Sequence, residues 1–112
     1  VGSEMCIRDR YSNDLFAGNA VVANNWHHIV FLFDSADDKR RIYKNSSLVA
    51  TDSSARTTTP NVTSTTTYLG YYYGSDITHF NGLMATCRIY NRSLTAAEVL
   101  QNYNATKARF GL

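Results

Sequence analysis

An aromatic cluster beside a short loop carries the clearest binding chemistry in this sequence. Residues 70–76 read GYYYGSD, and a histidine follows three positions later. Tyrosine rings stack on the apolar C–H faces of sugars, while a nearby Asp accepts hydrogen bonds from hydroxyls. The candidate ligand-binding residues are therefore Tyr71, Tyr72, Tyr73, Asp76 and His79. The competing interpretation is that alternate tyrosines pack in a core while the others cover a sheet.

The acidic residues do not form the pair that a glycosidase needs. Such an enzyme holds two carboxyl groups about 5 to 9.5 Å apart across the scissile bond, and on a strand they would lie at i and i+2 or i+4. The acids instead fall in a turn, in loops and on a predicted helix: Asp34, Asp37, Asp38, Asp52, Asp76 and Glu98. We therefore assign no catalytic residues.

A metal site has equally little support. The three acids of the 34–38 turn leave a Ca²⁺ site open, but nothing else in the sequence supports it, so we assign no metal ligand and no cofactor. His27 and His28 are neighbours, so they project to opposite faces of a strand and cannot bind one metal together. Cys87 lies in the apolar run LMATCRIY, where a free cysteine usually behaves as a buried hydrophobe. No base or cationic setting that would activate its thiol is visible.

Composition excludes two further classes of function. The formal net charge is +2 and the basic residues are scattered, which argues against nucleic acid as a partner. No stretch approaches the ~20 apolar residues of a membrane helix, so membrane insertion is not expected. The length of 112 residues fits one domain.

Most of the chain is predicted to be β structure. β-Branched and aromatic residues place strands at 19–22, 26–33, 40–44, 47–51, 66–73 and 77–91, with turns at 24–25 and 34–39. Both alternating sets of the 26–33 strand are largely apolar, which predicts cover on both faces. Asn45 and Ser46 form a two-residue hairpin loop. A type I′ turn needs φ > 0 at both positions, so Ser46 is a poor choice there.

The hydrophobic period changes near the C-terminus. Thr95 is a candidate N-cap with Glu98 three residues later, which is a capping box. Apolar residues then recur at helical spacing: Ala96, Val99, Leu100 and Tyr103. We expect one C-terminal helix that packs onto the β structure. The Ser/Thr-rich stretch 52–66 lies between apolar strands, so it is expected to be a surface connection within one domain rather than a linker.

The first ten residues, VGSEMCIRDR, fit neither a strand nor a helix period. They resemble the in-frame translation of a transposase adapter used to build sequencing libraries. We therefore expect residues 1–10 to be adapter-derived and residues 11–112 to be the C-terminal part of a single domain. The alternative is a genuine N-terminal strand, MCIRDRYS.

Four stretches together resemble the laminin-G-like branch of the concanavalin A-like lectin/glucanase superfamily. In chain order they are WHHIVFLFD, RIYKNSSLVA, YLG and FNGLMATCRIYNRSLTAAEVLQNY. The resemblance implies an all-β fold, an antiparallel β-sandwich of the jelly-roll type with one short C-terminal helix. This sequence departs from the pattern at Asn45-Ser46, where Asp-Gly or Asn-Gly is usual. It departs again at Ala85-Thr86-Cys87, where Asp-Glu-Val is usual, so contacts made through that acidic pair are in doubt.

The resemblance also implies a role without catalysis. We expect a recognition or adhesion module, carbohydrate-binding, in a larger extracellular or phage virion structural protein, because the tail LQNYNATKARFGL resembles the ends of such phage domains. Its expected partner is a glycan or glycosylated surface, and self-association through an exposed edge strand is also expected. Two alternatives stay open: a purely architectural β-sandwich spacer of a fibre or surface protein and, less favoured, a fragment of a glycoside hydrolase.

Overall fold

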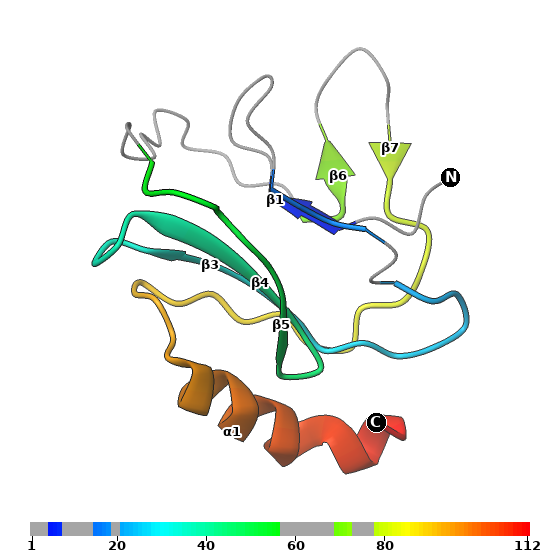
Figure 1. Cartoon of the computed structure of the whole chain (residues 1–112). Helices are drawn as coiled ribbons and strands as arrows, with labels where there is room; N and C mark the ends of the chain where they lie inside the picture. Colours follow the sequence, from blue (N-terminus) through cyan, green and yellow to red (C-terminus); the bar gives the residue numbers. More distant parts are fainter. Residues whose placement is uncertain (1–4, 8–14, 19–20, 57–68, 73–77) are drawn as a thin grey trace. The chain divides into compact units, whose positions relative to one another are not determined.

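The computed structural model describes residues 5–7, 15–18, 21–56, 69–72 and 78–112 (Figure 1). The chain divides into two compact units, residues 1–59 with 90–112 and residues 60–89. The larger unit contains β1 (Met5–Ile7), β2 (Leu15–Ala17), β3 (Ile29–Asp34), β4 (Lys39–Lys44), β5 (Ser47–Thr51), α1 (Ala96–Thr106) and the 3₁₀ helix η1 (Lys107–Phe110). The smaller unit contains β6 (Tyr71–Tyr72) and β7 (Thr78–His79). Within these described ranges no helix is long and apolar enough to cross a membrane.

An antiparallel sheet in the order β3-β4-β5 is the centre of the larger unit. β3 pairs with β4 from Ile29 opposite Lys44 to Asp34 opposite Lys39. The predicted turn between these strands and the predicted β4–β5 hairpin are both confirmed. Asn45 and Ser46 have φ of 47° and 70°, so both loop residues adopt the left-handed conformation that a type I′ turn requires.

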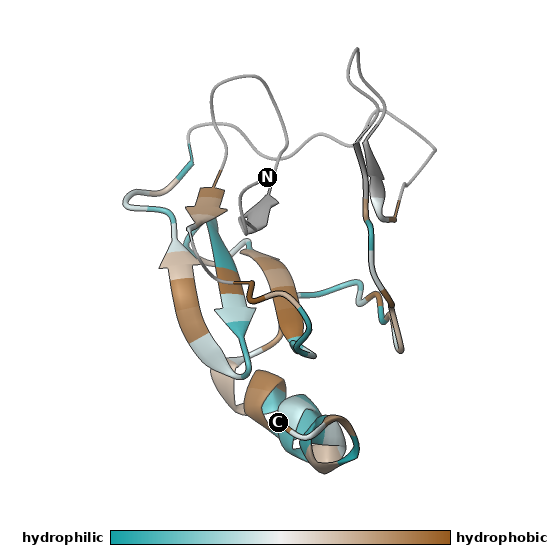
Figure 2. Ribbon diagram, turned by 90° about the vertical axis from the view of Figure 1, so that its right-hand side faces the viewer, coloured by the Kyte–Doolittle hydropathy of each residue, from teal (hydrophilic) through white to brown (hydrophobic). Residues whose placement is uncertain are grey.

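The β4 strand is buried on both faces because neighbouring residues of a strand point to opposite sides. Ile42 is fully buried in a cluster with Leu15 and Ala17 of β2. Tyr43, the next residue, is buried in a second cluster with Leu32, Leu94 and Val99. Figure 2 shows the hydrophobic stretches on these strands and on the first turns of the helix. The sheet of the larger unit is therefore covered by β2 on one side and by α1 on the other.

The C-terminal helix begins as the sequence predicts. Thr95 is the N-cap, and its side-chain oxygen accepts a hydrogen bond from the Glu98 N–H at 3.2 Å. The Glu98 carboxylate accepts in return from the Thr95 N–H at 2.9 Å, so the capping box is confirmed. The helix then tightens into η1, which ends before Gly111, whose φ of 67° is the left-handed conformation usual after a helix.

The helix packs along the residues that precede and form β3. Leu32 shares its cluster with Leu94 and Val99 near the start of α1. Further back along the chain, the His28 ring lies 5.9 Å from the Tyr103 ring, and the Trp26 ring lies 5.1 Å from that of Phe110. As the residue number falls from 32 to 26, its partner rises from 94 to 110. The helix therefore runs opposite in direction to β3 and covers one of the two predicted faces of the 26–33 segment. The other face is covered only in part, because Ile29 packs against the Ile42 cluster while Phe31 is 51% exposed.

Two strand predictions for this unit differ from the structure. Val21 and Val22 are not in a strand, and residues 19–20 lie outside the described residues. The reason is a local competitor. Nε2 of His27 lies 3.0 Å from both the backbone nitrogen and the carbonyl oxygen of Val22, so it accepts from the N–H in one tautomer or donates to the C=O in the other, in place of a ladder partner. The strand expected to begin at Trp26 begins at Ile29. β1 pairs with β2 in antiparallel register, Met5 opposite Ala17, while the adapter origin of residues 1–10 stays a prediction.

The long strand predicted over 77–91 is wrong in its extent. Only Thr78 and His79 pair, with β6, and residues 80–91 belong to no strand. Of the 66–73 prediction, Tyr71 and Tyr72 are in a strand, while 66–68 and 73 lie outside the described residues. The segment 80–91 has the composition of a strand, but a strand forms only against a partner, and none of the described residues provides one.

Cys87 is exposed, which contradicts the expectation that it is buried. Every residue from 80 to 92 is exposed, including Leu83 at 79% and Ile89 at 85%. The prediction failed because it judged burial from apolar neighbours, whereas burial also needs a second surface to cover them.

We predict that glycine at position 46 stabilises the fold. A residue with a Cβ is strained in the left-handed region by about 1–2 kcal/mol, and the greater freedom of glycine in the unfolded chain offsets about 0.5–1 kcal/mol of that gain. Ser46→Gly should therefore raise the free energy of unfolding by about 0.5 kcal/mol or more, measured by urea denaturation. Ser47→Gly, in β5, should lower it. If both substitutions change the free energy in the same direction, strain at Ser46 is not the cause.

We also predict that the exposed segment 80–92 makes the chain associate, because uncovered apolar residues outside any sheet are free to pair with another chain. Light scattering should give a mass above the monomer's 12.6 kDa. Ile89→Lys should return the mass toward the monomer, whereas Leu100→Lys, on an exposed helix position, should not. A native chain that is monomeric at high concentration would contradict this prediction.

Candidate functional site

The predicted ligand-binding residues lie around one β-hairpin of the smaller unit. Tyr71 stands opposite His79 and Tyr72 stands opposite Thr78. Opposite positions of an antiparallel pair share a face and neighbouring positions do not. The hairpin therefore brings positions 71 and 79 together and sends position 72 to the other face. Tyr73 and Asp76 lie outside the described residues.

Gly70 fixes the base of this hairpin. Its φ is 70°, and a Cβ at this position would lie 2.9 Å from Cε of Met84 and 3.2 Å from Cβ of Phe80. The Gly70 carbonyl also accepts a hydrogen bond from the Phe80 N–H at 2.7 Å. Both its conformation and its surroundings therefore require glycine. The contacts at this base join the chain just before β6 to the chain just after β7.

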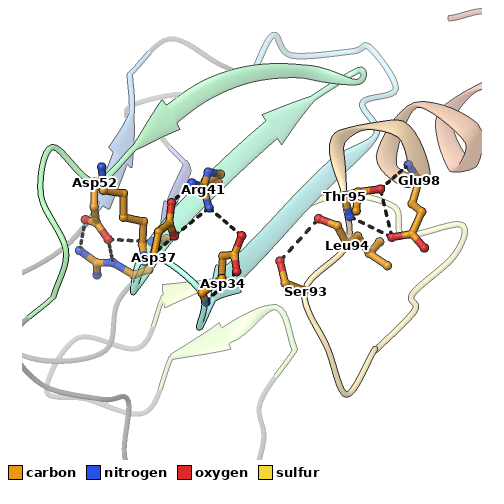
Figure 3. Close-up of polar contacts among 11 residues, drawn as sticks. Asp34, Asp37, Arg41, Asp52, Ser93, Leu94, Thr95 and Glu98 are labelled. Atoms are coloured by element: carbon orange, nitrogen blue, oxygen red, sulfur yellow. Dashed lines mark hydrogen bonds and ion pairs between the residues drawn. The ribbon is translucent and has the colours of Figure 1, made fainter.

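The best-buried charged residue of the described chain is an arginine. Arg40, in β4, is 3% exposed and binds Asp52, which is labelled in Figure 3. Its Nε donates to Oδ2 at 2.9 Å and its Nη2 donates to Oδ1 at 2.7 Å, while its backbone N–H donates to Oδ2 at 2.8 Å. These bonds to Arg40 hold the pKa of the Asp52 carboxyl below its usual value. Asp52 is thus a structural partner that ties the end of β5 to the start of β4.

Two of the three acids of the 34–38 turn, Asp34 and Asp37, are engaged in a similar way. Arg41 donates to Asp34 at 3.3 Å, and it also donates to both carboxylate oxygens of Asp37 (Figure 3). The bond to Arg41 lowers the pKa of Asp37. Asp34 and Asp37 also accept from the backbone N–H groups of Ala36 and Lys39. These two carboxylates therefore close the turn, and no group of three or more metal-binding side chains occurs among the described residues.

A third ion pair stabilises the start of α1. Arg92 donates to the two carboxylate oxygens of Glu98 at 2.9 and 2.7 Å. Glu98 also serves the capping box, so one carboxylate joins the incoming chain to the first helical turn (Figure 3). Together these bonds lower the pKa of Glu98 from its ordinary value of 4.5 to about 2, with the Arg92 bond the largest cause.

Comparison with known families identifies the fold. Residues 7–100 match the family described as the concanavalin A-like lectin/glucanases superfamily. The chain belongs to this family. The result confirms the resemblance carried by the four sequence stretches.

One solved structure extends the comparison. The concanavalin A-like chain is similar to a crystal structure of an S-layer domain-containing protein from Clostridium thermocellum, with a TM-score of 0.60 and 17% sequence identity. The match covers 81% of this chain and 45% of that one, so this chain spans less than half of its structural neighbour. A similarity at this identity concerns the fold alone. A comparison with curated proteins gives no match.

The concanavalin A-like chain also has an aromatic and cationic cluster that sequence reasoning missed. Trp26 packs against Phe110, and the guanidinium carbon of Arg109 lies 5.8 Å from the centre of the Phe110 ring. Nζ of Lys107 lies 5.5 Å from the centre of the Tyr103 ring. The basic residues are scattered along the sequence as a whole, so their positions alone did not predict this cluster. A signal was nonetheless present, since residues 99–112 contain two basic residues and no acid.

We predict that acid weakens the fold partly through Glu98. Because the pKa of this carboxyl is lower in the folded chain, its stabilising contribution is complete above about pH 4.5 and is lost as the pH falls toward 2. Glu98→Gln should be less stable than the native chain at pH 7, and the difference should shrink toward pH 2. Urea denaturation at a series of pH values measures both. Thr95→Ala, which removes the cap without removing the charge, should keep most of the pH dependence. If the free energies of unfolding of the native chain and of Glu98→Gln change in parallel with pH, Glu98 is not a source of the acid sensitivity.

Proposed function

We propose that this chain is a non-enzymatic recognition module that binds carbohydrate. The observation that carries the proposal is the hairpin of the smaller unit, which brings position 71, at the start of a run of three tyrosines, opposite His79. Tyrosine and histidine at opposite positions of a hairpin are residue types that suit a sugar, which offers an apolar C–H face and a rim of hydroxyls. Tyr73 and Asp76 complete the proposed site on the basis of the sequence.

The engaged carboxylates favour binding over hydrolysis. A glycosidase needs one carboxyl group free to donate a proton and a second free to act as a nucleophile or base. Asp34, Asp37, Asp52 and Glu98 instead bind arginines. The bonds to arginine lower the pKa of Asp37, Asp52 and Glu98, which is opposite to the raised pKa of a general acid.

We further propose that residues 11–112 are part of a jelly-roll sandwich displayed on an extracellular or virion structural protein. Family membership supports the sandwich. The solved neighbour, named as an S-layer domain-containing protein, supports a surface-associated role. The cover of the β3-β4-β5 sheet on both faces is compatible with an architectural spacer as well, so binding needs its own test.

Glycan-array binding of the native chain and its variants tests the proposal. Tyr71→Ala and His79→Ala should each weaken binding by about fivefold or more, because a stacked ring contributes on the order of 1 kcal/mol beyond its buried area. Tyr90→Ala, which removes a tyrosine of the larger unit, is the control and should bind normally. If all three variants bind like the native chain, the site is elsewhere, and a native chain that binds no glycan favours the architectural role.

A further inference from the structure

The sequence contains four copies of the Asn-X-Ser/Thr motif that oligosaccharyl transferases recognise, and their structural settings differ. The motifs begin at Asn45, Asn61, Asn91 and Asn104. An N-linked glycan is bulky and polar, so it needs an asparagine at the surface, in a segment outside regular secondary structure. Asn61 lies outside the described residues. The comparison therefore concerns the other three motifs.

Two of these motifs are held by secondary structure. Asn45 is half-buried in the β4–β5 turn, and its Oδ1 accepts a hydrogen bond from the His28 N–H at 2.9 Å. Asn104 and Thr106 are in α1, where residues two apart point to different faces. The Thr106 hydroxyl also donates to the Asn102 carbonyl at 3.2 Å. In each motif, one of the two groups that the enzyme recognises is therefore already engaged.

The motif at Asn91 has neither restraint. Asn91 is exposed in a bend before α1, outside any helix or strand. Among the described residues, its side chain has no hydrogen-bond partner. The Ser93 hydroxyl reaches the neighbouring Leu94 carbonyl at 3.5 Å (Figure 3), whereas a strong O–H···O bond is about 2.8 Å long. Both the amide and the hydroxyl of this motif are therefore available to an enzyme.

The position of Asn91 also coincides with the uncovered part of the chain. It belongs to the exposed segment 80–92 and follows directly after Ile89, which is 85% exposed, and Tyr90. Apolar residues exposed together favour association with other chains. A hydrated oligosaccharide attached beside them would keep a second chain away from these residues.

We propose that Asn91 is an N-glycan acceptor and that its glycan covers the exposed apolar residues of segment 80–92. In the reaction, Nδ2 of Asn91 attacks the anomeric carbon of an oligosaccharide carried on a polyprenyl pyrophosphate. The C–O bond to the phosphate breaks, the pyrophosphate leaves with the bonding electron pair, and a base of the transferase takes one proton from Nδ2. The saccharide is then a covalent part of the chain and not its ligand.

The inference rests on the extracellular placement proposed above, because these transferases act on exported chains. It does not rest on the tyrosine hairpin as a ligand site. A failure of glycan-array binding would therefore leave it unaffected, and a failure of glycosylation would leave the recognition function unaffected.

Secretion of the full chain from a eukaryotic cell line, behind a cleavable signal peptide, tests the acceptor. Peptide mass spectrometry should find a glycan on Asn91 of the native chain. The glycan should disappear in Ser93→Ala and persist in Ser93→Thr, which keeps the hydroxyl. Because the signal peptide supplies the export, an unmodified Asn91 in the secreted chain would overturn the assignment. Modification of Asn104 as complete as that of Asn91 would contradict the selection by structure.

Chains that keep a single motif test the cover. Replacing the hydroxyl residue of the other motifs leaves Asn91 as the acceptor in Ser47→Ala/Thr63→Ala/Thr106→Ala, and leaves Asn104 as the acceptor in Ser47→Ala/Thr63→Ala/Ser93→Ala. Trypsin cuts after Arg88, three residues before Asn91. A glycan on Asn91 should slow this cut severalfold relative to the cut after Arg109, and enzymatic removal of the glycan should restore its rate.

The same two chains report on association. By light scattering, the chain glycosylated at Asn91 should be closer to a monomer than the native chain made in bacteria without glycan. In the Asn104 chain, both the cut after Arg88 and the mass should match the bacterial chain. If the cut after Arg88 is equally fast with and without a glycan on Asn91, the glycan does not cover the segment.

Discussion

The burial of β4 on both faces is the constraint on which the larger unit depends. Ile42 and Tyr43 are consecutive, and each belongs to a different apolar cluster. A one-residue slip of β4 against its neighbours would exchange these two side chains and would also move Arg40 and Arg41 to the wrong sides. The register is therefore fixed jointly by hydrophobic packing and by ion pairs. The left-handed turn at Asn45 and Ser46 and the bulge between Ile42 and Tyr43 are local adjustments to that register.

The buried ion pair of Arg40 and Asp52 belongs to the same constraint. Removing a guanidinium from water is costly unless its donors are used, and Asp52 accepts from Nε and Nη2 while it also accepts from the Arg40 backbone. The Asp52 N–H donates to the Arg40 carbonyl at 3.1 Å in return. The pair thus continues the pairing of β4 and β5 beyond Thr51. The pair favours one register of β4 against β5, because a shift of β4 in either direction would leave a buried charge unpaired and so cost free energy.

Local signals predicted the larger unit well and the smaller unit poorly, for a physical reason. The capping box at Thr95 and Glu98 and the hairpin at Asn45 and Ser46 are complete within a few residues, so the sequence contains everything that forms them. A strand is different, because its existence depends on a partner that may be distant. Residues 80–91 have the right composition without a partner, and Cys87 is exposed for the same reason. The candidate site was predictable as residue types, whereas the opposition of Tyr71 and His79 required the hairpin register.

The aromatic cluster shows how one alternating sequence pattern can give different degrees of burial along its length. Trp26, His28, Val30 and Leu32 alternate toward the helix, but their partners change along it, from the buried Val99 to the half-buried Tyr103 and Phe110. The apolar seam therefore opens toward solvent as α1 passes into η1. Where the seam is closed, burial supplies the stability that holds the helix on the sheet. Where it opens, the Trp26 ring packs against Phe110 but stays 38% exposed, at a position that the closed part already holds in place.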